Sequence, residues 1–353
     1  MSQPGTPAQK TQTGLPGEIR TKRTGRNSDE KICLILNPKA AAGSAGKKID
    51  RLKRALDKSF KHWELRLTNG PRHATALAAQ ACEEGFDLVA AAGGDGTCHE
   101  VINGMIHEDR PRNSKTAFSL IPLGTGSDLM KTIKSPLNAE EAIWIASTGV
   151  TLPCDVGRAT ITTEAGKETR YFINVAGFGA NGEVVRQANA SSKRFGGQVT
   201  FLKATLKTAM RYTPPRVQIE WTIDDQSQHW EGALLSCFVA NGAYCGGGMW
   251  VGPNGSMHDG QADITILPAM SLGTQVLNMP KLYNGKLDQF SKSHCFQTAH
   301  LRATTTKNNR VYIDLDGELS GFLPASFSIL PRLLPVRSGW LHSLSPEATT
   351  KTQ

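Results

Sequence analysis

The segment AAAGGDGTCHEVINGM, residues 90–105, places one acid among three glycines where a run of small apolar residues gives way to a helical pattern. Glycine lets the backbone approach a phosphate closely, and the free amides at a helix N-terminus attract negative charge. The acid, Asp95, could orient a nucleotide, hold Mg²⁺ through water or accept a proton, although aspartate is also an ordinary turn and capping residue. The motif therefore predicts either a phosphate-binding loop or a tight turn.

A second glycine turn, LGTG at 123–126, follows another apolar run. In a parallel sheet the carboxyl ends of the strands are where ligands bind, and both glycine turns are expected there. Two such loops on neighbouring strands could cradle one triphosphate. The alternative is that each is only a tight connection between a strand and a helix.

Three acids, Asp314, Asp316 and Glu318, are crowded into VYIDLDGEL at residues 311–319. Crowded carboxylates raise each other's pKa and serve as general bases or magnesium ligands. A hairpin turn at the D-G pair is the competing interpretation. A simple hairpin turn explains this segment, with its three acids, less well than it explains the D-G pair at Asp259.

Asp259 lies in NGSMHDGQAD, residues 254–263, directly after the glycine-rich segment GGGMWVGP. A D-G pair between two strands is usually a hairpin turn, so a functional role needs further support. His99 and His258 each stand alone beside a motif, and we interpret both as incidental.

Two familiar nucleotide-binding fingerprints fail on this chain. AAGSAGKK at 41–48 has Ala41 where a P-loop begins with glycine, and Lys48 where serine or threonine would hold magnesium. GTGSDL at 124–129 ends in Leu129 where the dinucleotide motif needs glycine. Neither a P-loop nucleoside triphosphatase nor a dinucleotide-dependent dehydrogenase is supported.

Strand and helix patterns alternate in the first half of the chain and predict a parallel sheet flanked by helices. The expected strands are 31–38, 62–68, 86–94 and the start of 117–128, and the expected helices are 45–60, 73–85, 97–106 and 139–149. After about Cys154 strand-like segments separated by turns predict an antiparallel β domain. These segments are 171–179, 216–224, 233–242, 262–268 and 310–317, with one helical stretch at 198–212.

Composition limits the class of protein. The 353 residues suit two domains, and the formal net charge of +9 favours anionic partners such as nucleotides or acidic lipid surfaces. The seven cysteines form no C-x-x-C pair, which suits a reducing compartment such as the cytoplasm. No apolar run is long enough to span a bilayer, and the N-terminus has no secretory pattern. Nucleic acid is not an expected partner, because no stripe combines aromatic and basic residues.

The order of the motifs resembles the diacylglycerol kinase catalytic-domain family, particularly the soluble bacterial lipid kinases, with sphingosine and ceramide kinases as relatives. The order is N-P, then GGDGT-x-x-E-V-I-N-G, P-L-G-T-G-x-D, G-F-G, G-G-G-M-x-x-x-P, D-G-x-x-D and D-G-E. The similarity runs from about residue 31 to 340. GGDGT alone is shared with NAD kinases and phosphofructokinases, whereas the ordered set is far more specific.

The resemblance implies a fold of class α/β plus all-β. A Rossmann-like N-terminal domain, similar to NAD kinase and phosphofructokinase, precedes a β-sandwich C-terminal domain, with ATP in the cleft between them. The expected boundaries are a disordered basic tail at 1–28, an α/β domain at 29–154, a lipid-acceptor β-sandwich at 155–322, a return of 323–340 to the first domain, and a tail at 341–353.

The resemblance also assigns the site residues. It implies ATP contacts from Asn37, Thr68, Gly93, Gly94, Asp95, Gly96, Thr97, Gly124 and Thr125. It implies a magnesium site at Asp259, completed by the backbone carbonyls of Ser256 and Gln261. Glu318 matches the family's proton acceptor, with Asp316 as its rival, and Asp95 serves either the metal or the acceptor hydroxyl.

The expected function is an ATP-dependent lipid kinase that transfers the γ-phosphate to a hydroxyl of a membrane lipid such as diacylglycerol. The expected cofactor is Mg²⁺, and the enzyme is expected to visit the inner membrane surface from the cytoplasm, with a homodimer left open. A sphingoid-base or ceramide kinase, an NAD kinase and a non-catalytic nucleotide or lipid sensor remain alternatives. A DNA-binding protein is the weakest of the rival interpretations.

Overall fold

The computed structural model describes residues 28–40, 43–123, 128–190, 211–223, 226–306 and 309–339. Some of the predicted features lie outside these residues. They are both tails apart from Ser28, nearly all of the helical stretch at 198–212, and Gly124 and Thr125 of the second glycine loop. Among the described residues, no helix is long and apolar enough to cross a membrane.

The first half contains the parallel sheet that the sequence predicts. Its strands are β1 (Ser28–Leu36), β2 (Phe60–Leu67), β3 (Leu88–Gly93) and β6 (Ala117–Pro122), in the order β6-β3-β1-β2. The helices are η2 (Gly46–Lys48), α1 (Ile49–Ser59), α2 (His73–Glu83), α3 (Asp95–Met105), α4 (Asp128–Thr132) and α5 (Ala139–Thr148). A short hairpin, β4 (Ile106–His107) and β5 (Arg110–Pro111), follows α3.

Both faces of this sheet are covered, and the alternation of side chains along β1 shows how. Cys33 and Ile35 point to the core that is shared with α2 and α3. The alternating residues Ile32, Leu34 and Leu36 point to the other face of the sheet, into a core that is shared with α1 and α5. A strand buried on both faces is apolar at every position, which explains why this sequence shows a continuous apolar run.

The second half is antiparallel, as predicted, and its long strands pack around a separate apolar core. The strands are β7 (Val150–Thr163), β8 (Gly166–Phe172), β9 (Val175–Gly179), β10 (Arg216–Ile223), β11 (Gln226–Ala240), β14 (Ala262–Pro268), β15 (His294–Thr298), β16 (His300–Thr305), β17 (Tyr312–Leu315) and β18 (Glu318–Ser338). The ribbon β12 (Tyr244–Cys245) and β13 (Met249–Trp250) and the helices α6 (Ala180–Ala190), α8 (Leu272–Tyr283) and η4 (Leu287–Gln289) lie around it.

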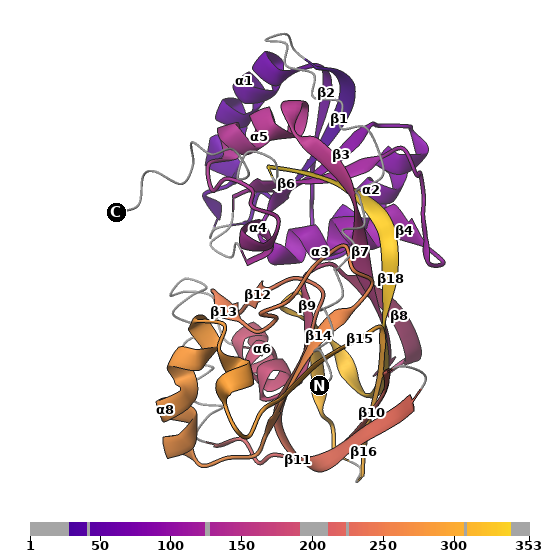
Figure 1. Cartoon of the computed structure of the whole chain (residues 1–353). Coiled ribbons are helices and arrows are strands. Elements are labelled where there is room, and N and C mark those ends of the chain that lie inside the picture. The colour runs from indigo at the N-terminus through magenta and orange to yellow at the C-terminus, as the bar shows by residue number, and fades with distance from the viewer. Residues whose placement is uncertain are drawn as a thin grey trace, which may run out of the picture.

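Strands β7 and β18 link the two halves, and Figure 1 shows both running from the lower half into the upper half. They pair antiparallel from Phe322 opposite Thr162 to Ser338 opposite Val150, and Val336 then pairs parallel with Phe118 of β6. The described part of the expected return segment 323–340 thus begins in the β-rich half and reaches the parallel sheet near Ser338.

A buried carboxylate holds this ribbon where its register shifts between Leu330 and Leu334. Asp155 of β7 is fully buried and accepts backbone hydrogen bonds from Arg332 and Gly260, both at 2.7 Å. Arg332 has a φ of 52°, so the backbone turns sharply there. Asp155 therefore fastens three segments at the junction of the two halves.

Two local predictions differ from the structure. The sequence pattern predicts one strand over 171–179, but this segment breaks into β8 and β9 at Ile173 and Asn174. The backbone amides of Ile173, Asn174 and Val175 turn to a buried carboxylate of Asp316 and leave the regular ladder. Helices α4, α6 and α8 have no counterpart among the helices that the sequence predicts.

Candidate active site

The residues expected to contact ATP lie along one edge of the parallel sheet. Asn37 follows β1, and its amide donates to the carbonyl of Ala92 at 3.2 Å. Thr68 follows β2, and its amide donates to Leu36 at 2.9 Å. Gly93 ends β3 and accepts from the amide of Leu123 at 3.1 Å, immediately before the second glycine loop. These carboxyl ends form the edge where α/β sheets bind ligands.

The turn at Gly93–Thr97 requires glycine for steric reasons. A Cβ atom at Gly93 would lie 2.3 Å from Oγ1 of Thr97, so the buried threonine closes the turn against a bare backbone. Gly94 is the N-cap of α3, and its carbonyl accepts the amides of Thr97 at 3.0 Å and Cys98 at 3.2 Å. The amides that precede them in the first turn have no acceptor within the helix, which leaves them suited to an anion.

Asp95 lies at the start of α3 within a cluster of acids. Burial, followed by the neighbouring carboxylates of Asp128, Asp316 and Glu318, raises its pKa to about 7 against the opposing effect of Lys131. Such a concentration of negative charge favours a bound cation or a proton. The structure therefore places Asp95 beside both acids of the D-G-E segment, although these lie in the other half of the molecule.

Asp128 is a site residue that the sequence-based prediction misses. It begins α4, where its carboxylate accepts the amide of Gly247 at 2.7 Å and lies 3.4 Å from the ammonium of Lys131. The glycine-rich segment of the second half thus contacts the first half through this aspartate. Asp128 could have been found from the sequence, because it is the acid of the motif P-L-G-T-G-x-D. The predicted ATP contacts from that motif include only Gly124 and Thr125.

Glu318 reaches the first turn of α3 from the other half of the molecule. A Cβ atom at Gly96 would lie 2.2 Å from Oε1 of Glu318, so the carboxylate occupies the space that glycine leaves open. The two residues of the turn before it, Asp316 and Gly317, have φ of 51° and 81°, as a type I′ hairpin requires. The exposed Glu318 is therefore aimed at the GGDGT loop by the hairpin between β17 and β18.

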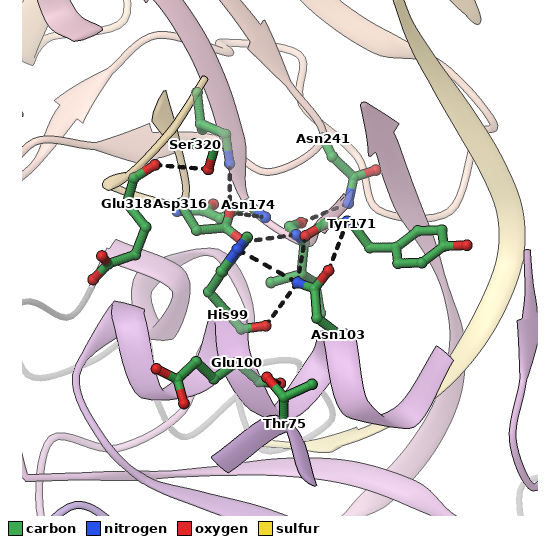
Figure 2. A network of polar contacts seen from close by, with 12 residues as sticks. Thr75, His99, Glu100, Asn103, Tyr171, Asn174, Asn241, Asp316, Glu318 and Ser320 are labelled. Carbon is green, nitrogen blue, oxygen red and sulfur yellow. Dashed lines mark hydrogen bonds and ion pairs between the residues drawn. The ribbon is translucent and has the colours of Figure 1, made fainter. Parts of the chain in front are cut away.

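Asp316 has a different environment, which Figure 2 shows. It is only 8% exposed, and its oxygens accept backbone amides from Ile173 at 3.1 Å, Asn174 at 2.9 Å and Val175 at 3.2 Å. Nδ1 of His99 lies 3.3 Å from the same carboxylate. Asp316 therefore lies in a hairpin turn with its carboxylate held by backbone amides, and His99, which the sequence analysis interprets as incidental, is its buried partner.

The same network ties α3 to the β-rich half. Nδ2 of Asn103 donates to the carbonyls of His99 and Tyr171, both at 2.8 Å, and its oxygen accepts the amide of Tyr171 at 2.9 Å. Asn103 belongs to the E-V-I-N-G part of the motif, and Figure 2 shows it between α3 and β8. One face of α3 is thus fixed against the half that carries Glu318.

Two further motif residues have structural explanations. Glu100 accepts the amides of Arg72 at 2.9 Å and Ala74 at 3.0 Å, so it caps the N-terminus of α2. Asp314 accepts Nδ2 of Asn181 at 3.2 Å, and burial together with Asp316 raises its pKa to about 7. The crowding of acids predicted from the sequence is therefore present, although each carboxylate has a separate environment.

Asp259 lies elsewhere, at the junction of the halves. Its Oδ1 accepts the amide of Gln261 at 3.0 Å, and its pKa is raised by partial burial and by the nearby Asp155. The three ligands expected from the resemblance are one carboxylate and the carbonyls of Ser256 and Gln261, an oxygen set that fits a partly hydrated Mg²⁺. Among the described residues there is no cluster of three or more acids, histidines or cysteines that could hold a metal.

Comparisons with known proteins identify the family of this chain. The model of the diacylglycerol kinase catalytic domain matches residues 31–159, and the model of the YegS C-terminal NAD kinase beta sandwich-like domain matches residues 174–338. The chain belongs to the diacylglycerol kinase catalytic-domain family. Its resemblance to that family and its assignment as a phosphotransferase with an alcohol acceptor are thereby confirmed.

Individual relatives of this family cover most of the chain. A diacylglycerol kinase of Bacillus subtilis (strain 168) is 26% identical over 86% of this chain and 94% of that enzyme. A "Probable lipid kinase YegS-like" of Xanthomonas oryzae pv. oryzae (strain MAFF 311018) is 27% identical over 72% of this chain and 80% of its own length. The crystal structure of a diacylglycerol kinase from Bacillus anthracis str. Sterne superposes with a TM-score of 0.68 at 23% identity, covering 91% of this chain and 99% of that one, and so supports the fold.

Proposed function

We propose that this member of the lipid kinase family transfers the γ-phosphate of ATP to a hydroxyl of a membrane lipid such as diacylglycerol. The observation that carries the proposal is the approach of Glu318 to Gly96, which brings a carboxylate to the first turn of α3. A potential proton acceptor then lies beside the amides that are suited to hold a phosphate.

The nucleotide site follows the edge of the parallel sheet. In this proposal the amides of Gly94, Asp95 and Gly96 bind ATP phosphates, with Asn37 and Thr68 at the neighbouring strand ends. Gly124 and Thr125, which follow the edge residue Leu123 in the sequence, are assigned to the same role by the motif alone. Phosphoryl transfer needs mainly alignment and neutralisation of charge, which backbone amides supply at little reorganisation cost.

Glu318 is the proposed base, in preference to Asp316. A base needs a lone pair within reach of the substrate, and the carboxylate of Asp316 already accepts three backbone amides and faces His99. Glu318 is exposed and faces the loop. Its carboxylate takes the proton of the lipid hydroxyl, the lipid oxygen bonds to the γ-phosphorus, and the bond from that phosphorus to the β,γ-bridging oxygen breaks to release ADP.

The acid cluster suits magnesium that arrives with ATP. Asp95 and Asp128 would hold the ion near the phosphates. The neighbouring carboxylates that raise the pKa of Asp95 would also stabilise a bound cation. When bound, the ion neutralises charge on the phosphate oxygens. A second ion at Asp259, Ser256 and Gln261 would have a structural role, because those residues lie at the β7–β18 junction.

The test is the transfer of labelled γ-phosphate from ATP and Mg²⁺ to a panel of lipids in mixed micelles. The panel contains diacylglycerol, monoacylglycerol, ceramide, a sphingoid base and phosphatidylglycerol, with NAD as a soluble control. We expect one labelled glycerolipid, whereas labelled ceramide or sphingoid base would move the enzyme to that branch. Labelled NADP alone would contradict the proposal in favour of an NAD kinase, and ATP binding without transfer to any acceptor would favour a sensor.

A further inference from the structure

Helix α8 has its polar and apolar faces reversed relative to an ordinary surface helix. The residues that point outward are large and apolar, and Val276 and Leu277 are 67% and 81% exposed. The residues that point toward the protein include Thr274, Gln275 and Asn278. A helix of a water-exposed surface normally buries its apolar side, so this arrangement indicates an apolar partner outside the molecule.

Four of the exposed side chains form a continuous stripe, and Leu277 widens the apolar face beside it. Leu272, Val276, Met279 and Tyr283 recur at intervals of four, three and four residues, which places them on one side of the helix. No residue of α8 is buried, although Leu282 packs against the small core beneath the helix and Lys281 donates to the carbonyl of Gln289 at 3.1 Å. Figure 1 shows α8 on the outside of the lower half. Among the described residues, its main contacts with other elements are to β13 and η4.

The charges around α8 favour an anionic lipid surface over other apolar partners. The helix has no acidic residue, and the segment that follows it carries the exposed Lys286 and Lys292 with Asp288 as its one acid. The whole chain carries a formal net charge of +9. Apolar side chains flanked by lysines, with a tyrosine at the edge, are typical of a helix that lies in the interface of a bilayer.

Contacts connect α8 to the candidate active site. Gly285, just after the helix, lies against the indole of Trp250 in β13, where a Cβ atom would be 2.6 Å from the ring. Trp250 pairs with Tyr244, whose ring lies 5.8 Å from the ammonium of Lys131 beside Asp128. The glycine segment between β12 and β13 donates to that same aspartate. A membrane at α8 would therefore lie at the side of the molecule where this ribbon reaches the acids.

We propose that α8 is a membrane-docking helix that inserts Leu272, Val276, Leu277, Met279 and Tyr283 among the headgroups and upper acyl chains of an anionic bilayer. The helix has twelve residues, which is too short to span a bilayer but sufficient to lie in its interface. The link between this docking and catalysis rests on the proposed function, because docking through α8 would bring the enzyme to a lipid acceptor in the membrane.

The test compares the full chain with the variant Val276→Glu/Leu277→Glu in flotation with vesicles of phosphatidylcholine and phosphatidylglycerol. We expect the variant to lose at least tenfold in vesicle binding while its melting temperature stays unchanged, because both residues are exposed. The matched control is Leu137→Glu, a comparably exposed leucine in the first half at 73%, which should bind as the unmodified chain does. Lys286→Gln/Lys292→Gln should weaken binding about fivefold for each lysine at low salt.

A second readout separates this inference from the proposed function. Turnover of diacylglycerol embedded in vesicles should fall in the α8 variant, whereas turnover of a short-chain diacylglycerol kept below its aggregation concentration should not change. If the unmodified chain phosphorylates neither acceptor, the proposed function fails, and vesicle binding still decides the role of α8. Unchanged vesicle binding in the variant, or an equal loss in Leu137→Glu, would overturn the inference. A dimer that becomes monomeric in the variant with unchanged vesicle binding would assign the face to a second copy of the chain.

Discussion

Two neighbouring acids of one hairpin have opposite environments. The carboxylate of Asp316 is buried and saturated with donors, whereas Glu318, two residues later, faces the first turn of α3. In the sequence both look like candidates for the same role. Only the contacts of this hairpin with β8 and β9, which lie far earlier in the chain, distinguish them.

The first prediction concerns Asp316→Asn. Asparagine tolerates the positive φ of this position, so the backbone of the turn should be retained. The charge-assisted bonds to the three amides are weakened and one acceptor oxygen becomes a donor, which should lower the free energy of unfolding by about 2 kcal/mol or more. Urea unfolding measures this change. Glu318→Gln is the matched control and should leave stability nearly unchanged, and equal stability of both variants would contradict the structural role of Asp316.

A second prediction follows from the pKa of Asp95, which burial and three neighbouring carboxylates raise to about 7. The folded state then binds a proton that the unfolded state releases near pH 4, so stability falls as pH rises from about 4 to 7. Asp95→Asn removes this loss. We expect the variant to be more stable than the unmodified chain by about 1–3 kcal/mol at pH 8 without ATP or Mg²⁺.

The advantage of Asp95→Asn should shrink as the pH falls toward 4, because both forms of the chain then carry a neutral side chain at this position. Urea midpoints at pH 5 and pH 8 measure the difference. A gain that does not depend on pH would show that the ionisation of Asp95 is not its cause.

At the scale of elements, the sequence predicts the framework well because periodicity reports burial. The continuous apolar runs of β1 and β3 and the helical spacing of α1 and α2 are local signals, and the structure confirms them. The break between β8 and β9 has no local signal, since it is caused by a carboxylate in the hairpin that precedes β18. Helix α8 has apolar residues at helical spacing, but Gly273 and the internal Pro280 weaken the prediction of a helix from its sequence.

The third prediction concerns the turn that aims Glu318. Gly317 has a φ of 81° with open space around a Cβ atom, so Gly317→Ala costs conformational strain without a clash. Gly166, the first residue of β8 after the turn from β7, has a φ of 116° and equally open space. Both alanine variants should lose about 1 kcal/mol of stability.

Only Gly317→Ala should also reduce turnover, by roughly tenfold or more, because misdirecting a base by a small distance is costly. The steady-state rate at saturating ATP, set beside the urea midpoint of each variant, separates the two effects. Equal turnover in both variants would indicate that the hairpin does not position a reacting group.

The whole molecule joins a two-faced parallel sheet to an antiparallel half through the β7–β18 ribbon, with the acids gathered where the halves meet. The sequence indicates each half, but it does not reveal that Asp128 contacts the glycine segment 119 residues away. Such contacts depend on how the halves pack. The motifs that identify the family lie far apart in the sequence, and several of their residues meet where the two halves pack together.

The fourth prediction concerns the whole molecule and follows from its net charge of +9. Binding to vesicles that contain phosphatidylglycerol should weaken severalfold between about 50 and 300 mM KCl, because salt shortens the range of the attraction. Flotation at a series of salt concentrations measures it, with pure phosphatidylcholine vesicles as the control. Binding that is unaffected by salt would contradict an electrostatic contribution.

The most direct test of the central claim is the turnover of Glu318→Gln with its lipid acceptor, measured together with its dissociation constant for ATP. If Glu318 accepts the proton of the hydroxyl, kcat should fall by roughly 10²–10⁴-fold while ATP binding and the melting temperature stay unchanged. A variant that keeps most of its kcat would show that another group takes the proton, and the assignment of this site would fail.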